Sequence, residues 1–132
     1  MAPTLHAGDV LLLLRTADRP HERDVVAVST PADDGVVIKR VVATAGQQVA
    51  VADGVLFVDD VPVAEPSVEA ESVDGTWFGP VLVPSESVFV LGDHRELSID
   101  SRHHGPVSLD DVVGVAVVRL WPPSRLGDVL DP

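Results

Sequence analysis

The densest group of polar side chains lies between Gly92 and Pro106, directly after the apolar run Val88–Leu91. It holds carboxylates, arginines and hydroxyls, the groups that exchange protons and form ion pairs. A polar loop that leaves a buried strand can hold a site rigidly, although most such loops are solvated connections. On composition alone, the plain connection is the better interpretation.

Lys39 is the only lysine of the chain and lies within the apolar run 36–42. A lysine among β-branched neighbours loses hydration of its charged form, which lowers its pKa and leaves an amine that can accept a proton. The alternative is an edge-strand lysine whose ammonium group reaches water. Strand alternation predicts two faces, with Val37, Lys39 and Val41 on one and Ile38, Arg40 and Val42 on the other.

The elements that must position these residues are short apolar runs separated by Gly, Pro and Asp. Asp53-Gly54 between two of them is a strong hairpin signal. No segment has a sustained helical period, so at most a short turn is expected at Ser108–Asp111. The expected strands are Asp9–Leu14, Asp24–Ser29, Val36–Ala45, Gln48–Val51, Val55–Val58, Val61–Val63, Val81–Val83, Val88–Leu91 and Val112–Leu120.

These runs predict an all-β, mostly antiparallel fold with little helix, a folded-over barrel or sandwich of short strands. Valine fills 27 of the 132 positions, which favours strands because branched side chains suit a pleated surface. We expect one domain over residues 1–132, with a hairpin and loop excursion at about 46–84. Within it, Glu65–Gly79 is acidic and rich in Pro and Gly, so it should be exposed.

Composition excludes several classes of function. The formal charge of −12 argues against nonspecific binding to nucleic acid. The absence of cysteine excludes disulfides, a thiolate nucleophile and thiolate metal sites. The histidines are adjacent or scattered, so we predict no metal and no cofactor. The residues given contain no run long enough to span a membrane and no signal peptide, so they should form a soluble fragment.

Four segments, in order along the chain, together resemble the type I signal peptidases, membrane-anchored serine endopeptidases with a Ser/Lys dyad. Their first motif, Ser-Met-x-Pro-Thr-Leu, is matched from its second residue, and the motifs that follow are matched at family-like spacing. The matching residues are Met1 to Leu5 with Gly8-Asp9, Lys39-Arg40-Val41-Val42 with Gly46, Gly92-Asp93, Arg95, Ser98, Asp100-Ser101-Arg102 and Gly105, and Gly114-Val115-Ala116 with Trp121-Pro122.

The main departure is that the nucleophilic serine of the family would stand immediately before Met1. Either the sequence given begins one residue late, the interpretation we prefer, or the chain is a naturally inactive relative. In both cases this chain is expected to be inactive as it stands. His94, Glu96 and Leu97 also differ from the Asn, Asp and Asn that the family usually has.

The resemblance implies a role for each matching residue. Lys39 would be the general base, Ser98 would orient its amine, and Asp93 and Arg102 would form an ion pair that fixes the loop, with Asp100 as a second partner of Arg102. Met1, Leu5 and Ile38 would line shallow pockets for small side chains, typically Ala at the first and third positions before the cut.

The resemblance also implies partners and a location. The substrates would be the signal peptides of exported preproteins, cleaved at the extracytoplasmic face of the plasma membrane. An upstream transmembrane helix would anchor the full-length protein at the membrane surface. Two alternatives stay open: a dedicated precursor-maturation protease of the same superfamily, and a non-catalytic pseudopeptidase that binds extended peptides.

Overall fold

Two antiparallel sheets form the fold in this computed structural model, which describes residues 8–15, 19–30, 35–65, 77–95, 98–122 and 127–128. The larger sheet has the strand order β1-β10-β2-β3-β8-β9, and β11 also pairs with β10. Its strands are β1 (Val10–Leu14), β2 (Val25–Thr30), β3 (Gly35–Thr44), β8 (Ser87–Leu91), β9 (Val107–Ser108), β10 (Val112–Trp121) and β11 (Gly127–Asp128).

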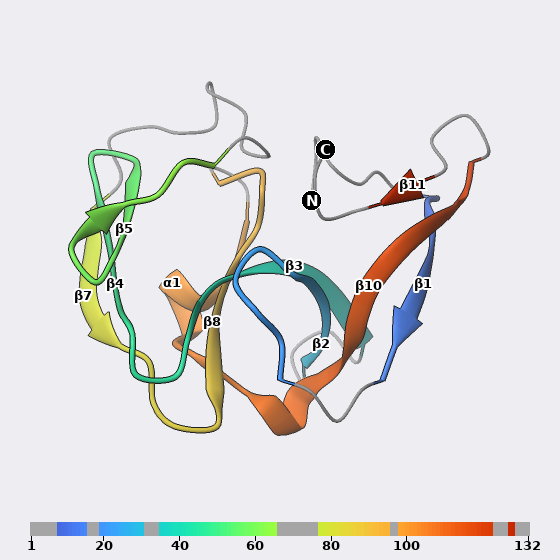
Figure 1. Cartoon of the computed structure of the whole chain (residues 1–132), viewed down its shortest axis with the longest axis horizontal. Coiled ribbons are helices and arrows are strands. Elements are labelled where there is room, and N and C mark those ends of the chain that lie inside the picture. Colours follow the sequence, from blue (N-terminus) through green and yellow to red (C-terminus); the bar gives the residue numbers. More distant parts are fainter. Residues whose placement is uncertain are drawn as a thin grey trace.

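The smaller sheet has the order β6-β5-β4-β7 and lies at one side of the molecule in Figure 1, away from β1 and β10. Asp53 and Gly54 connect β4 to β5 with φ angles of 49° and 79°, which confirms the expected hairpin. The strands are β4 (Gln48–Ala52), β5 (Val55–Val58), β6 (Val61–Pro62) and β7 (Phe78–Leu82).

The core that joins the two sheets is built from one face of each. Phe89 of β8 is fully buried, and its ring centroid lies 5.5 Å from that of Phe78 on β7. The other buried members are Val42, Ala43 and Leu91 from the larger sheet, and Val49, Val51, Leu56, Val58 and Val83 from the smaller sheet and its flank. Burial of this much apolar surface is the main force that holds the sheets together.

The opposite face of the larger sheet packs a second cluster, in which Val41 of β3 contacts valines of β2, β8 and β9. Val37 packs against this cluster, whereas Val42 belongs to the core between the sheets. The predicted alternation along β3 is therefore confirmed. It gives Lys39 and Arg40 different surroundings although they are neighbours in the chain.

The expected fold class is confirmed: strands predominate and all pairings are antiparallel. The 3₁₀ turn η2 (Leu109–Asp111) occurs where a short turn was expected. The four-residue helix α1 (Ser101–His104) was not predicted, because one turn is too short to show a period. No helix among the described residues is long and apolar enough to cross a membrane.

One expected boundary needs correction. The strand β7 begins at Phe78 rather than Val81, so it starts inside the segment Glu65–Gly79 that was expected to be an exposed loop. Phe78 is half-buried because it packs against the core between the sheets. Residues 66–76 of that segment lie outside the described residues.

Candidate active site

Lys39 and Ser98, which are 59 residues apart in the sequence, meet through a side-chain hydrogen bond. Lys39 lies on β3 opposite Val26 of β2, and Ser98 lies in the loop that follows β8. The Nζ atom of Lys39 donates to Oγ of Ser98 over 2.9 Å in a partly buried position. The expected contact between these two side chains is present.

Gly92 makes this contact possible, because it allows Ser98 to approach the backbone. A Cβ atom at Gly92 would lie 2.2 Å from Oγ of Ser98 and 3.6 Å from Nζ of Lys39. Real Cβ atoms do not come this close to other heavy atoms, so no larger side chain fits unless Ser98 moves. The glycine that opens the loop is thus a steric requirement of the Lys39–Ser98 pair.

The surroundings of Lys39 favour its neutral form. Burial lowers the pKa of the amine below its ordinary value of 10.5, because the charged form loses hydration. The carboxylate of Asp100 opposes this effect, and the positive charge of Arg102 reinforces it. A lysine with a lowered pKa can accept a proton closer to neutral pH than an exposed lysine can.

Asp100 holds the loop together from its centre. It is completely buried, caps the first turn of α1, and accepts hydrogen bonds from the backbone N–H of Gly92 (3.1 Å) and from Nε of Arg102 (2.9 Å). Burial alone would raise the pKa of Asp100. Hydrogen bonds from Arg102, Gly92 and Ser98, together with the charge of Arg102, lower it below 3.8.

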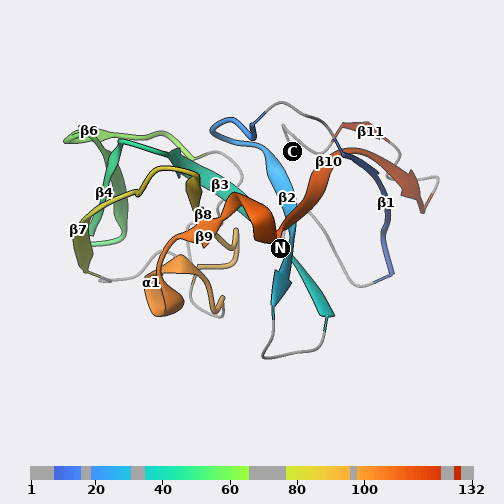
Figure 2. The ribbon, with the colours of Figure 1, turned by 90° about the horizontal axis from the view of Figure 1, so that it is seen from below.

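The short helix α1 is bound to the strand that leads into the loop. Its first residue, Ser101, is buried and accepts a hydrogen bond from the backbone N–H of Val90 over 3.0 Å. Figure 2 shows α1 and β9 next to β8, on the same side of the molecule. The described part of the polar segment is therefore tied to β8 through Ser101 and through β9, which pairs with β8.

The prediction of an ion pair between Asp93 and Arg102 is wrong. Asp93 is completely buried and binds the guanidinium of Arg40 through both carboxylate oxygens, each at 2.9 Å. Arg102 binds Asp100, the residue that was expected as its second partner. Strand alternation explains why Asp93 pairs with Arg40. It turns Arg40 to the face of β3 opposite Lys39, and a guanidinium buried there requires a carboxylate partner.

Sequence reasoning also missed a partner of this loop. Arg95 is buried and forms an ion pair with Glu65, which follows β6. The position of Arg95 in the family-like motif indicated that it belongs to the loop. Nothing in the sequence indicated Glu65 as its partner, because Glu65 stands in a segment that was expected to be exposed.

An open pocket of about 470 Å³ adjoins Lys39. Its walls are mainly apolar and come from β2, β3, β8 and the segments on either side of α1, including Val28, Val37, Val90, Ile99, Pro106 and Val107. Ile38 packs on the other face of β3, against the buried residues Val25 and Ala116. Met1 and Leu5 lie outside the described residues, so the substrate-contact roles of these three residues stay predictions.

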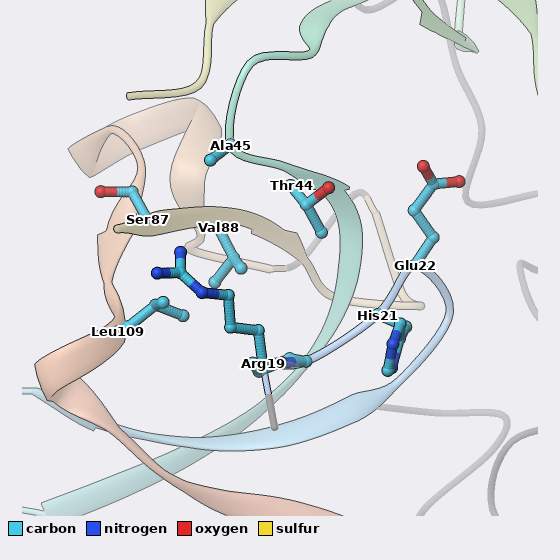
Figure 3. A pocket seen from close by; sticks show the side chains of 9 residues that line it. Arg19, His21, Glu22, Thr44, Ala45, Ser87, Val88 and Leu109 are labelled. Carbon is cyan, nitrogen blue, oxygen red and sulfur yellow. The ribbon is translucent and has the colours of Figure 1, made fainter. Parts of the chain in front are cut away.

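A larger, open pocket of about 900 Å³ lies near the other end of β3 and contains neither Lys39 nor Ser98 among its lining residues. Figure 3 shows Arg19, Val88 and Leu109 gathered there with Thr44. Arg19 is already paired with Glu86 on the surface. Among the described residues, no group of three His, Asp or Glu side chains could hold a metal ion.

Comparison with known proteins gives a consistent result. The family model described as "Signal peptidase, peptidase S26" matches residues 1–121. "Signal peptidase I" of Leptolyngbya laminosa is 33% identical, covering 100% of this chain and 70% of the relative. "Signal peptidase I V" of Bacillus subtilis (strain 168) is 38% identical, covering 87% of this chain and 77% of the relative.

A third relative is longer than this chain. "Thylakoidal processing peptidase 1, chloroplastic" of Arabidopsis thaliana is 37% identical over 98% of the chain, but the chain spans only 42% of that relative. A crystal structure of a signal peptidase I from Enterococcus faecalis V583 superposes with a TM-score of 0.65 at 28% identity, covering 76% of this chain and 98% of that one. The chain therefore belongs to the peptidase S26 family of signal peptidases.

Proposed function

We propose that this chain is the catalytic domain of a signal peptidase I-like serine endopeptidase that uses a Ser/Lys dyad. The observation that carries the proposal is the hydrogen bond between Lys39 and Ser98 beside an apolar pocket. A lysine whose amine is aimed by a hydroxyl, and whose pKa is lowered by burial, has the properties of a general base. The names of the family and of its relatives support the reaction class.

The proposed reaction needs a serine immediately before Met1, as in the family motif. Neutral Lys39 takes the proton of that hydroxyl while the serine oxygen forms a bond with the scissile carbonyl carbon. The Lys39 ammonium group then gives the proton to the leaving amine as the peptide bond breaks. In the second half of the reaction, Lys39 takes a proton from the water whose oxygen attacks the ester carbonyl, and it returns that proton to the serine oxygen as the ester bond breaks.

The remaining residues hold Lys39 in position. Ser98 orients its amine, and Asp100 with Arg102 fixes the loop that carries Ser98. Asp93 supports the same loop through Arg40, which is the next residue along β3. Met1, Leu5 and Ile38 are proposed to contact the small side chains of an Ala-x-Ala sequence.

The proposed substrates are the signal peptides of exported preproteins, bound in extended form at a strand edge. We place the full-length protein at the extracytoplasmic face of the membrane, anchored by a helix upstream of this chain. This location is inferred from the family. It is independent of the geometry around Lys39.

The test is cleavage by the chain with one serine added before Met1. It should cut a peptide that carries Ala-x-Ala and leave a matched peptide with Phe at the last position uncut. Replacing the added serine by Ala, or Lys39→Met, should abolish cleavage, while the thermal unfolding curve stays cooperative. Unchanged cleavage in Lys39→Met would disprove the dyad. Binding of the peptide without cleavage would favour the pseudopeptidase alternative.

A further inference from the structure

The side chain of Arg95 connects two parts of the chain that are distant in sequence. It is only 6% exposed and donates from Nε to the backbone carbonyl of Gly92 over 2.8 Å. Its two terminal nitrogens bind Glu65, Nη1 to Oε2 at 3.1 Å. A guanidinium is suited to this task, because its rigid fork can bind a carboxylate and a carbonyl at once.

Glu65 approaches the loop from the smaller sheet. It stands three residues after β6, and its side chain is 15% exposed. It also lines a small pocket with Arg40, the buried partner of Asp93. The loop between β8 and α1 is thus anchored to the smaller sheet as well as to its own sheet.

The peptide groups of Gly92 are held from both sides. Its N–H donates to Asp100 over 3.1 Å, and its carbonyl accepts from Arg95. The carbonyl of Arg95 accepts in turn from Nη2 of Arg102 at 2.7 Å. Because Ser98 rests directly against Gly92, a shift of this backbone moves the hydroxyl that receives the hydrogen bond from Lys39.

We propose that Glu65 is a positioning residue for the Lys39–Ser98 pair, acting through Arg95 and the backbone of Gly92. The inference rests on the proposed function, in which that pair does the chemistry. Without its carboxylate partner, the buried guanidinium of Arg95 is unfavourable, and moving towards water lowers its free energy. It then releases the carbonyl of Gly92, the loop loosens, and water reaches the amine of Lys39.

The direction of the effect follows from the cause of the lowered pKa. Burial is the largest influence on Lys39, and the charges that follow are those of Asp100 and Arg102. Loosening the loop restores hydration, so the Lys39 pKa rises. If the ion pair were purely structural, removing it would lower the free energy of unfolding and leave the Lys39 titration unchanged.

The experiment uses the fact that Lys39 is the only lysine. Labelling the 132-residue chain with ¹⁵N-lysine gives a single side-chain signal, whose pH titration reports the Lys39 pKa whether or not a nucleophile is present. Glu65→Gln should raise this pKa by about half a unit or more. The matched control is Glu86→Gln, which removes the carboxylate of the exposed Arg19–Glu86 pair and should leave the titration unchanged.

A double-variant cycle tests the route through Arg95. Arg95→Gln should also raise the Lys39 pKa, and the Glu65→Gln/Arg95→Gln double variant should raise it no further. Additive shifts would overturn the route. If Glu65→Gln does not fold, Glu65→Asp, which shortens the reach to Arg95, should give a smaller rise in the same direction.

An unchanged Lys39 titration in the folded Glu65 variant would overturn the inference and leave the proposed function intact. Failure of the proposed function has a different signature: the serine-bearing protein does not cleave, although its Lys39 titrates as in the unmodified chain. In the serine-bearing protein, Glu65→Gln should shift the rise of cleavage rate to higher pH and lower kcat more than it changes KM.

Discussion

The guanidinium of Arg40 and the carboxylate of Asp93 form a two-pronged ion pair with side chains 6% and 0% exposed. It joins β3 to the first turn of the loop that carries Ser98. Since Arg40 is the neighbour of Lys39 along β3, the same strand supplies the proposed base on one face and the loop's anchor on the other.

Asp93→Asn keeps the shape of the side chain and removes its charge, which leaves Arg40 buried without this carboxylate. The free energy of unfolding should fall by about 3–5 kcal/mol, measured by urea denaturation. Glu86→Gln is the control, because its ion pair with Arg19 is exposed and should matter by less than about 1 kcal/mol. Equal effects of the two substitutions would contradict the assignment.

Gly92→Ala places a methyl group where the Ser98 hydroxyl lies. Ser98 must move away from Lys39, so cleavage by the serine-bearing protein should fall by about 100-fold or more. Gly46→Ala is the control: its new methyl group meets nothing within 4 Å, although its φ of +88° makes alanine strained there. Gly46→Ala should lose some stability and keep its activity. Full activity in Gly92→Ala would show that the contact is unnecessary.

Asp100 should make stability depend on acid pH. Its pKa is lowered on folding, so the folded state binds fewer protons than the unfolded state around and below 3.8. Its stabilising contribution is complete above that value and is lost as pH falls through the lowered folded pKa. The difference in unfolding free energy between the unmodified chain and Asp100→Asn should therefore shrink as the pH falls from about 6 to about 3.

The control for this pH dependence is Asp110→Asn, which changes an exposed carboxylate. It changes the net charge by the same amount as Asp100→Asn, so it corrects for the general effect of removing one negative charge. A constant difference for Asp100→Asn would mean that its carboxylate is no more strongly held in the folded state than in the unfolded state.

Ser98→Ala removes the hydroxyl that receives the hydrogen bond from Lys39. In the serine-bearing protein kcat should fall by about 100-fold with a smaller change in KM. The Lys39 amine is then no longer oriented by a hydrogen bond, while the peptide-binding site is unchanged. Ser85→Ala, at an exposed position, should leave both constants unchanged. A change confined to KM would indicate that Ser98 contacts the peptide instead.

The nine strands expected from the sequence are all present, because they are short apolar runs separated by Gly, Pro and Asp, but the two-residue strands β9 and β11 were not expected. The sequence also predicted that Lys39 and Arg40 face opposite ways, since alternation is a local property of a strand. The partner of Asp93 could not be predicted this way, because Arg40, Arg95 and Arg102 were all chemically suitable. Only the packing of β3 against the loop decides between them.

The contact between Glu65 and Arg95 was even less accessible to sequence reasoning. It depends on how the smaller sheet is placed against the larger one, a long-range property. Likewise, the requirement for glycine at position 92 follows from the path of Ser98, which residue spacing alone does not determine.

In the proposed mechanism, Lys39 acts as the base in its neutral form. The most direct measurement compares two pH values: the midpoint of the rise in kcat/KM for the serine-bearing protein, and the Lys39 pKa from its single ¹⁵N side-chain signal. The rate should rise with pH, with a midpoint equal to the titrated pKa and below 10.5. If Lys39 titrated at 10.5 while kcat/KM had already reached its plateau at neutral pH, neutral Lys39 would not be the base.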